Sequence, residues 1–308
     1  MGFGQAGGSN YESVGLPAAK QAIAAACLQA AERAEVEMPQ VQAACFSLAG
    51  ADFPEDFMML ESALGELQLA RKFVVTNDSI AALRSGTRRS YGVVVIMGSG
   101  MNAAAVDLTG REYRLPAEGY LYGDWGGAGS IGTEVMHRVF RAHDGRGQPT
   151  ILTRMTLDFF GVSSMEELTT RLYKGELPDD RIPELTPLVF EAAYEGDAVA
   201  CEIVSKVGQE AGLAAIAMMK RAGLDRREVD IVLGGSIFRG RGPLLLDTVA
   251  AAVHAANPLA CLVAPAWQPV VGAVIMAVEL SGSPAGYEVW ENIERTYDSV
   301  ALGPLGNG

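Results

Sequence analysis

The sequence predicts an α/β protein with two domains, and three observations support this. Up to residue 114, apolar runs of strand length alternate with stretches of helical periodicity. Two of these runs end in distinctive loops: residues 73–75 lead into a polar loop, and residues 93–96 lead into a glycine-rich loop. A length of 308 residues favours two hydrophobic cores over one. Because ligands of open α/β sheets bind beyond the carboxyl ends of the strands, these loops are the first candidates for a site.

The first domain, residues 1–112, is expected to alternate strands with helices. Pro54 suits the first turn of a helix, and Thr109-Gly110 is typical of a hairpin turn. The predicted helices are residues 17–36, 54–67 and 79–83, and the predicted strands are residues 41–48, 73–76, 93–97, 102–108 and 112–114.

The second domain, residues 113–308, is expected to be mostly helical, with a helical insertion around residues 145–222. Within the insertion, residues 174–187 contain three prolines and are predicted to form a surface excursion or a hinge-side loop. The predicted helices are residues 131–141, 149–160, 165–173, 187–194, 198–222 and 244–255, and the predicted strands are residues 229–233 and 261–263.

Charge and composition exclude several classes of partner. The net charge of -13 repels nucleic acid and anionic lipid, so neither is expected as a partner. The sequence has no apolar stretch of membrane-spanning length, and we expect a cytoplasmic protein. Its four cysteines lie in apolar runs without a metal-binding spacing, so no protein-held metal is predicted. An acidic protein can still bind ATP, because Mg²⁺ supplies compensating charge and backbone amides contact the phosphates.

Asp78 is the strongest catalytic candidate. It follows a buried strand and precedes an apolar helix, which suits a general base that accepts the proton of an attacking hydroxyl in phosphoryl transfer. The alternative is structural: Asn77 or Asp78 caps the following helix.

Two glycine clusters are candidates for nucleotide binding. Gly98-Ser99-Gly100 lies between two strands, where a bare turn lets phosphate oxygens approach backbone N–H groups; the alternative is a tight hairpin with glycine at positive φ. Gly234-Gly235-Ser236 follows the strand 229–233, where missing side chains allow close packing against an adenosine; the alternative is an ordinary turn.

Asp124 stands beside Trp125 just before a predicted helix. Its carboxylate could accept hydrogen bonds from sugar hydroxyls or merely complement the helix dipole, and the sequence leaves both open.

A set of short motifs runs along the whole chain. The motifs are Gly7-Gly8-Ser9-Asn10, Ser47-Leu48-Ala49-Gly50, Thr76-Asn77-Asp78, residues 96–102, Gly123-Asp124, Leu233-Gly234-Gly235-Ser236 and Pro269-Val270-Val271-Gly272-Ala273. Taken in order, they resemble the N-acetylglucosamine kinase and BadF/BadG/BcrA/BcrD-type ATPase family, part of the superfamily of sugar kinases, heat-shock chaperones and actin. The resemblance implies two ribonuclease-H-like (actin-like ATPase) domains around a central cleft.

The resemblance also implies roles for individual residues. Asp78 matches the catalytic base. The positions expected to bind the sugar are Asn10, Gly50, Asn77 and Asp124. The second phosphate loop is Gly98, Ser99 and Gly100, and the adenosine loop is Gly234, Gly235 and Ser236.

Two departures from the family pattern bear on activity. In the family, a first phosphate loop that also holds Mg²⁺ precedes the point where this sequence starts, and its loss would expose a sheet edge and remove a phosphate cradle. Either the start codon is misplaced or the product is impaired, and the sequence favours a misplaced start. Trp125 stands where the family usually has an acid, close to the expected sugar pocket.

The predicted function is an ATP-dependent amino-sugar kinase that phosphorylates N-acetylglucosamine or a related sugar at the 6-hydroxyl, with ATP and Mg²⁺ as cofactors and a possible homodimer as the assembly. One alternative is an ATPase that activates a 2-hydroxyacyl-CoA dehydratase, which would need cysteine ligands for an iron–sulfur cluster. The other is a non-catalytic sugar-binding remnant of the kinase fold.

Overall fold

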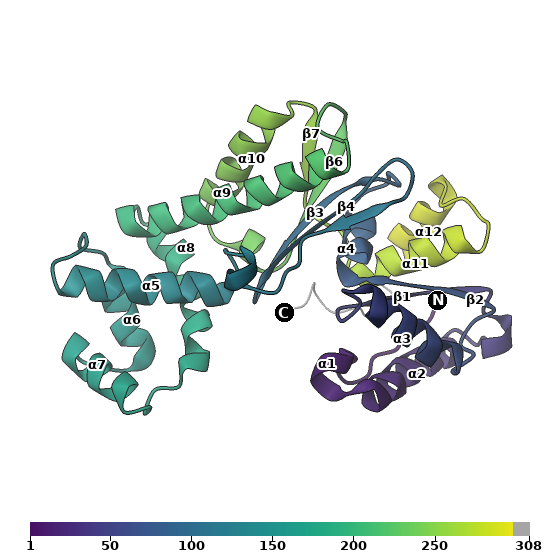
Figure 1. The fold of residues 1–308 in the computed structure, drawn as a ribbon, viewed down its shortest axis with the longest axis horizontal. Coiled ribbons are helices and arrows are strands. Elements are labelled where there is room, and N and C mark those ends of the chain that lie inside the picture. The colour runs from purple at the N-terminus through teal and green to yellow at the C-terminus, as the bar shows by residue number, and fades with distance from the viewer. Residues whose placement is uncertain (298–308) are drawn as a thin grey trace. The chain divides into compact units, whose positions relative to one another are not determined.

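A computed structural model describes residues 1–297 as two compact units of mixed α/β structure (Figure 1). Unit 1 comprises Met1–Val94, Ala104–Glu112 and the described residues from Val263 on. Unit 2 comprises Val95–Ala103 and Tyr113–Leu262. The division passes through strands β3 (Gly92–Met97) and β4 (Met101–Val106).

Unit 1 is built on a two-stranded parallel sheet, in which Leu48 of β1 pairs with Asn77 of β2. Both strands therefore end at the same edge. Helices surround the pair, and buried Ile23, Leu60 and Val75 belong to its core. The elements are α1 (Tyr11–Val14), α2 (Leu16–Arg33), η1 (Met38–Gln40), β1 (Ala43–Leu48), α3 (Pro54–Gly65), β2 (Lys72–Asn77), α4 (Asp78–Gly86), α11 (Pro269–Leu280) and α12 (Tyr287–Tyr297).

The N-terminal segment lies along the alanine-rich face of α2. A Cβ atom added at Gly2 would lie 1.8 Å from the Ala30 carbonyl oxygen, and one at Gly4 would lie 1.8 Å from the Ala26 carbonyl oxygen. Arg33 fastens the segment by donating to the Phe3 carbonyl at 2.7 Å. Glycine is required here for close packing against a helix backbone.

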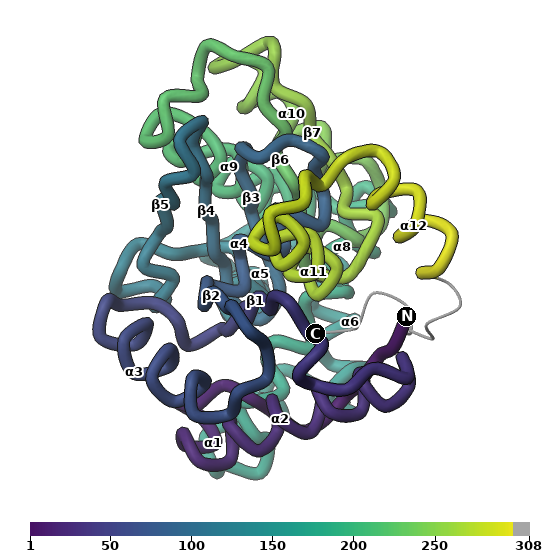
Figure 2. The backbone as a smooth tube through the Cα atoms, turned by 90° about the vertical axis from the view of Figure 1, so that its right-hand side faces the viewer, coloured from purple at the N-terminus to yellow at the C-terminus, as the bar shows by residue number. Residues whose placement is uncertain are grey.

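Unit 2 contains most of a five-stranded sheet with the order β5-β4-β3-β6-β7 (Figure 2). The remaining strands are β5 (Glu112–Arg114), β6 (Val229–Gly234) and β7 (Ala260–Val263). Strands β3 and β6 are almost entirely buried, as expected for apolar runs covered on both faces.

The helices of unit 2 pack closely where small residues meet. On α9, Cβ atoms added at Gly208 and Gly212 would lie 2.6 Å from the side chains of Thr248 and Ala252 on α10. The helical elements are η2 (Tyr120–Tyr122), α5 (Ala128–His143), α6 (Leu152–Phe160), α7 (Met165–Tyr173), η3 (Asp179–Leu185), α8 (Thr186–Tyr194), α9 (Ala198–Arg221), η4 (Ile237–Arg239) and α10 (Leu244–Ala256).

The prediction of a surface excursion at residues 174–187 was wrong in part. Residues Asp179–Leu185 form η3, which packs on α5 with Leu177 and Leu185 buried. A Cβ atom at Gly132 of α5 would lie 2.2 Å from the Ile182 carbonyl oxygen. Because glycine has no side chain, η3 can pack this closely against the helix.

The other predicted strands and helices are confirmed, with boundaries that differ by a few residues. Helices α11 and α12 were not predicted. Within residues 1–297, no helix is both long and apolar enough to cross a membrane. The domain boundary near residue 112 stays a prediction.

Gly272 of α11 offers a test of close packing in unit 1. A Cβ atom there would lie 1.9 Å from the Ala81 carbonyl oxygen of α4, so Gly272→Ala should force the two helices apart. Since overpacking costs roughly 1–3 kcal/mol, we expect a comparable loss in the free energy of unfolding, measured by urea denaturation.

Gly65→Ala is the matched control. The added methyl group would have ordinary contact with Phe73 at 3.8 Å, so the change should be neutral or stabilising. Equal stabilities for the two variants would contradict the packing argument.

Candidate functional site

The predicted site residues fall into two clusters, one in each unit. In unit 1, Asn77 and Asp78 follow β2, while Gly50 follows β1. Because Leu48 and Asn77 are paired, the two loops leave the same edge of the sheet. Asn10 joins them from the start of α1, since its Oδ1 atom would lie 2.9 Å from a Cβ atom at Gly50.

Asn77 is the N-cap of α4, which decides between the two capping alternatives. Its Oδ1 atom accepts from the Ser79 backbone N–H at 3.0 Å, and also from the Ser79 hydroxyl. Its Nδ2 atom donates to Asp52 Oδ1 at 2.9 Å and to the Ala51 carbonyl at 3.3 Å. Asn77 is 1% exposed, so its hydrogen bonds tie the two loops together in a buried position.

Asp78 is the first residue of α4 and is half-buried. At this position a carboxylate is stabilised by the positive end of the helix dipole. Because Asn77 is the N-cap of α4, Asp78 is not the capping residue.

The loop after β1 is fixed by acids that the sequence analysis did not single out. Asp56 accepts from the Phe53 backbone N–H at 2.7 Å and from the Tyr11 hydroxyl at 2.6 Å. The second bond, with burial, raises the pKa of Tyr11 to about 12. Asp52 accepts from Asn77, as described above. The sequence signal was Asp56 in the first turn after Pro54, which is typical of a helix start.

In unit 2, the two glycine clusters lie side by side at the ends of β3 and β6. Gly235 has φ +96°, and a Cβ atom there would lie 2.1 Å from the Met97 carbonyl oxygen. A Cβ atom at Gly234 would contact Ile96 at 3.6 Å. Because their carboxyl ends coincide, the neighbouring strands run parallel, and the loops 98–100 and 234–236 share one edge of the sheet.

Residues 98–100 do form a tight hairpin between β3 and β4, closed by a bond from Gly98 N–H to the Gly100 carbonyl at 2.9 Å. The expected positive φ was wrong, since neither Gly98 nor Gly100 has it. A Cβ atom at either glycine would meet no atom within 4 Å. The loop therefore presents bare backbone to open space.

The start of α5 holds this loop in place. Ala128 N–H donates to the Gly98 carbonyl at 2.8 Å, and a Cβ atom at Gly127 would lie 2.5 Å from Gly100 Cα. The positive end of α5 is thus directed at the carbonyl groups of the loop.

A cavity of about 630 Å³ opens beside the loop 98–100 within unit 2. Asp124 lines it and is 8% exposed. Asp124 Oδ2 accepts from the Gly119 backbone N–H at 2.9 Å, so this carboxylate closes the loop 119–124. Helix α5 begins four residues later, at Ala128, with Gly127 as its N-cap, so Asp124 lies outside the first turn of that helix. Hydrogen bonding of Asp124 to a sugar stays a prediction. The other lining residues include Ser99, Gly100, Trp125, Glu134, His137 and Lys206.

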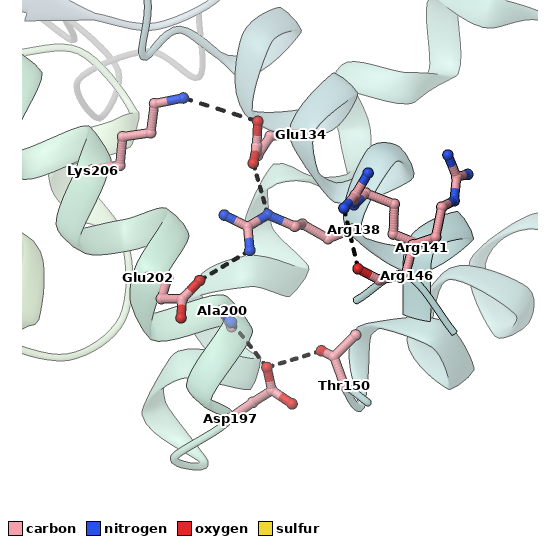
Figure 3. Close-up of polar contacts among 9 residues, drawn as sticks. All are labelled: Glu134, Arg138, Arg141, Arg146, Thr150, Asp197, Ala200, Glu202 and Lys206. Atoms are coloured by element: carbon pink, nitrogen blue, oxygen red, sulfur yellow. Dashed lines mark hydrogen bonds and ion pairs between the residues drawn. The ribbon is translucent and has the colours of Figure 1, made fainter. Parts of the chain in front are cut away.

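A chain of alternating charges, Lys206, Glu134, Arg138 and Glu202, starts at this cavity (Figure 3). Lys206 and Glu134 line the cavity, and Arg138 and Glu202 continue the chain away from it. Lys206 Nζ lies 3.8 Å from the centroid of the Trp125 ring and 3.9 Å from Glu134 Oε2. Glu134 Oε1 accepts from Arg138 Nε at 2.8 Å, and Arg138 Nη1 donates to Glu202 at 2.9 Å. The sequence held one signal, the i,i+4 spacing of Glu134 and Arg138, and none for Lys206.

The pKa of Glu134 reflects this chain. Burial disfavours the charged carboxylate, but the hydrogen bond from Arg138 and the nearby Lys206 ammonium together lower the pKa below its ordinary value.

The cysteines show no metal-binding arrangement. Burial raises the pKa of Cys45 to about 12 and also raises that of Cys27, so both thiols stay protonated. In the part of the chain that the structure describes, no group of three or more His, Cys, Asp or Glu side chains could hold a metal ion.

Comparison with known proteins identifies the family. Residues 1–277 match the BadF/BadG/BcrA/BcrD ATPase family. The chain belongs to this family. The resemblance stated from the sequence motifs is thereby confirmed.

Two curated relatives cover most of the chain. An N-acetylmuramic acid/N-acetylglucosamine kinase from Clostridium acetobutylicum is 27% identical over 75% of this chain and 76% of its own. An N-acetyl-D-glucosamine kinase from Dictyostelium discoideum is 28% identical over 88% of both chains.

A solved structure described as a candidate N-acetylglucosamine kinase from Chromobacterium violaceum is 22% identical, with a TM-score of 0.63 over 90% of both chains. This likeness confirms the α/β fold of actin-like ATPase type.

Arg138→Gln tests the charge chain. Without the guanidinium, the pKa of Glu134 should rise toward its ordinary value of 4.5, as followed by carboxyl-carbon NMR titration. Because the pKa is lowered in the folded state, Glu134 contributes stability above pH 4.5 that is lost as the pH falls through the folded pKa. The variant should lose less stability on acidification.

Arg171→Gln provides the control, since Arg171 pairs with Glu167 on α7 rather than with Glu134. An unchanged pKa of Glu134 in Arg138→Gln would refute the assigned cause.

Proposed function

We propose that this chain is an ATP-dependent kinase that phosphorylates N-acetylglucosamine or a related amino sugar at its 6-hydroxyl. The observation that carries this proposal is that two curated relatives, aligned over 75% and 88% of the chain, are named as kinases of N-acetyl amino sugars. Membership of an ATPase family supports ATP as the phosphate donor.

Asp78 is assigned as the general base. It accepts the proton of the sugar hydroxyl while the hydroxyl oxygen forms a bond to the terminal phosphorus of ATP and ADP leaves. Its place at the start of α4, beside the buried Asn77 cap, supports this role, because a fixed carboxylate at the end of a strand can be held in line with a substrate.

Asn10, Gly50, Asn77 and Asp124 are assigned to the sugar. In unit 1, the bare backbone at Gly50 lies next to the Asn10 amide, which can both donate to and accept from sugar hydroxyls. In unit 2, the buried Asp124 lines the cavity beside Trp125, and an aromatic ring next to an acid suits a sugar's apolar face and hydroxyls.

The loops 98–100 and 234–236 are assigned to ATP. The open space at Gly98 and Gly100 fits phosphate oxygens that approach backbone N–H groups, and Gly234-Gly235 lies against the same strand end. Mg²⁺ fits as an ion carried by the nucleotide, since it is usually held by phosphates with only one or two carboxylates. When bound, it neutralises charge on the transferred phosphate.

The alternatives receive less support. An activator of a 2-hydroxyacyl-CoA dehydratase would need an iron–sulfur cluster, whereas Cys27 and Cys45 are half-buried thiols whose raised pKa keeps them protonated. A sugar-binding remnant would bind the sugar without ATP, which calorimetry can test directly. A homodimer and a cytoplasmic location stay predictions.

Asp78→Asn tests the general base. General acid–base catalysis contributes about 10²–10⁴-fold, so kcat for ADP release with N-acetylglucosamine should fall by that factor in a coupled assay. Sugar binding should change little, because the amide keeps the shape of the carboxylate.

Asp158→Asn, on the exposed face of α6, should retain full activity. A kcat for Asp78→Asn within a few-fold of the unaltered chain would exclude Asp78 as the base. Absence of turnover by the unaltered chain with every amino sugar would exclude the proposed kinase activity.

Gly127→Ala tests the nucleotide loop. The added Cβ atom would lie 2.5 Å from Gly100 Cα and should displace the loop, weakening ATP binding in calorimetry by about tenfold or more. Gly129→Ala is the control, because its Cβ atom would lie 3.9 Å from the Ser99 carbonyl oxygen. Equal ATP affinities in both variants would contradict the assignment.

A further inference from the structure

A second cavity, of about 340 Å³, lies in unit 2 beside α5. It is distinct from the cavity at the loop 98–100, but Glu134 and His137 line both. Three arginines line it, two from α5 and one from the loop that follows. The lining also includes Gln148, Val199 and Glu202.

The backbone after α5 brings these arginines together. Arg138 and Arg141 are three residues apart and share one face of the helix. The chain then turns back, with Gly147 N–H donating to the Arg141 carbonyl at 2.8 Å. Arg141 Nη2 donates in turn to the Arg146 carbonyl at 3.1 Å, which fixes the loop against the helix (Figure 3).

The charges of the three arginines are not equally neutralised. Arg138 is shared between Glu134 and Glu202. Arg146 pairs with Asp144 at 2.5 Å. For Arg141, no carboxylate among residues 1–297 lies within ion-pair distance, and its hydrogen bond goes to a neutral carbonyl. The Arg141 charge does act on Asp144 from beyond that distance and lowers the pKa of that carboxyl, but Asp144 is already paired with Arg146. Arg141 is therefore the least neutralised of the three arginines.

The opposite wall comes from α9. Val199 and Glu202 lie in the first turns of this helix of 24 residues, whose N-terminus is capped by the Asp197 carboxylate. The favourable charge for an anion therefore comes from the arginines and not from this wall. Arg141 lies in the last turn of α5, where a cation complements the negative end of the α5 dipole. This explains a cation at position 141, but it does not explain why the following loop turns back and places Arg146 beside it.

We propose that this cavity binds the phosphate group of a small anionic molecule, held by Arg141 and Arg146 with Arg138 beside them. Guanidinium groups suit this ligand because their planar N–H pairs match two phosphate oxygens. The site does not depend on the proposed kinase activity.

The charge chain couples this site to the larger cavity. A phosphate that attracts Arg138 competes with Glu134 for the same guanidinium, and Glu134 also faces Lys206 in the larger cavity. Occupancy of one cavity therefore changes the electrostatics of the other, and the coupling is reciprocal.

The test is calorimetric titration of the full chain with inorganic phosphate, at constant ionic strength set with sodium chloride. We expect saturable binding with a Kd of about millimolar or tighter, weakened by about tenfold or more in Arg141→Gln and in Arg146→Gln. Arg154→Gln, an exposed arginine of α6 outside the cavity, should bind within about twofold of the unaltered chain.

A hexose 6-phosphate serves as a second probe. Tighter binding than inorganic phosphate identifies a phosphorylated sugar as the ligand, and equal binding identifies phosphate itself.

Phosphate bound instead at the loop 98–100 would be insensitive to both variants, and that result overturns the proposal. Absence of binding in the unaltered chain also overturns it. Because Arg146 lies on an exposed loop, its variant keeps the test valid if Arg141→Gln fails to fold.

Discussion

Close backbone contact at the ends of β3 and β6 is the constraint on which the site in unit 2 depends. Gly235 can pass the Met97 carbonyl, and Gly127 can lie against Gly100, only because these residues carry no side chain. The two contacts bring the loop 234–236 against the end of β3 and the start of α5 against the loop 98–100. Open space remains at the loop 98–100 itself, since a Cβ atom at Gly98 or Gly100 would meet no atom within 4 Å.

In unit 1, a side chain rather than a glycine contact holds two loops together. The Asn77 amide uses both its oxygen and its nitrogen to join the start of α4 to the loop after β1. A buried amide with all partners in place is rigid, whereas one with a missing partner is costly. The adjacent Asp78 follows this fixed cap as the first residue of α4.

The sequence predicted well where a single local pattern decides the outcome. The apolar runs predicted where the strands lie, and the polar and glycine residues after those runs predicted the positions of both glycine loops and of Asn77-Asp78. Helix α11 was missed because residues 269–280 are apolar on nearly every side, and such a run has no helical period that distinguishes it from a strand. The segment 174–187 was misjudged because its prolines and charges are typical of a loop, while Leu177 and Leu185 are buried only through tertiary contact.

The charge chain from Lys206 to Glu202 could not be predicted for a different reason. Its members come from α5 and α9, which are separated in sequence by the helices between them, and only the Glu134–Arg138 spacing is local. Long-range pairs of this kind are fixed by how helices pack, and a single sequence does not contain that information. The consequence is a division of roles: local patterns locate the loops proposed to bind ligands, whereas the packing of α5 against α9 sets the charge at the cavity beside the loop 98–100.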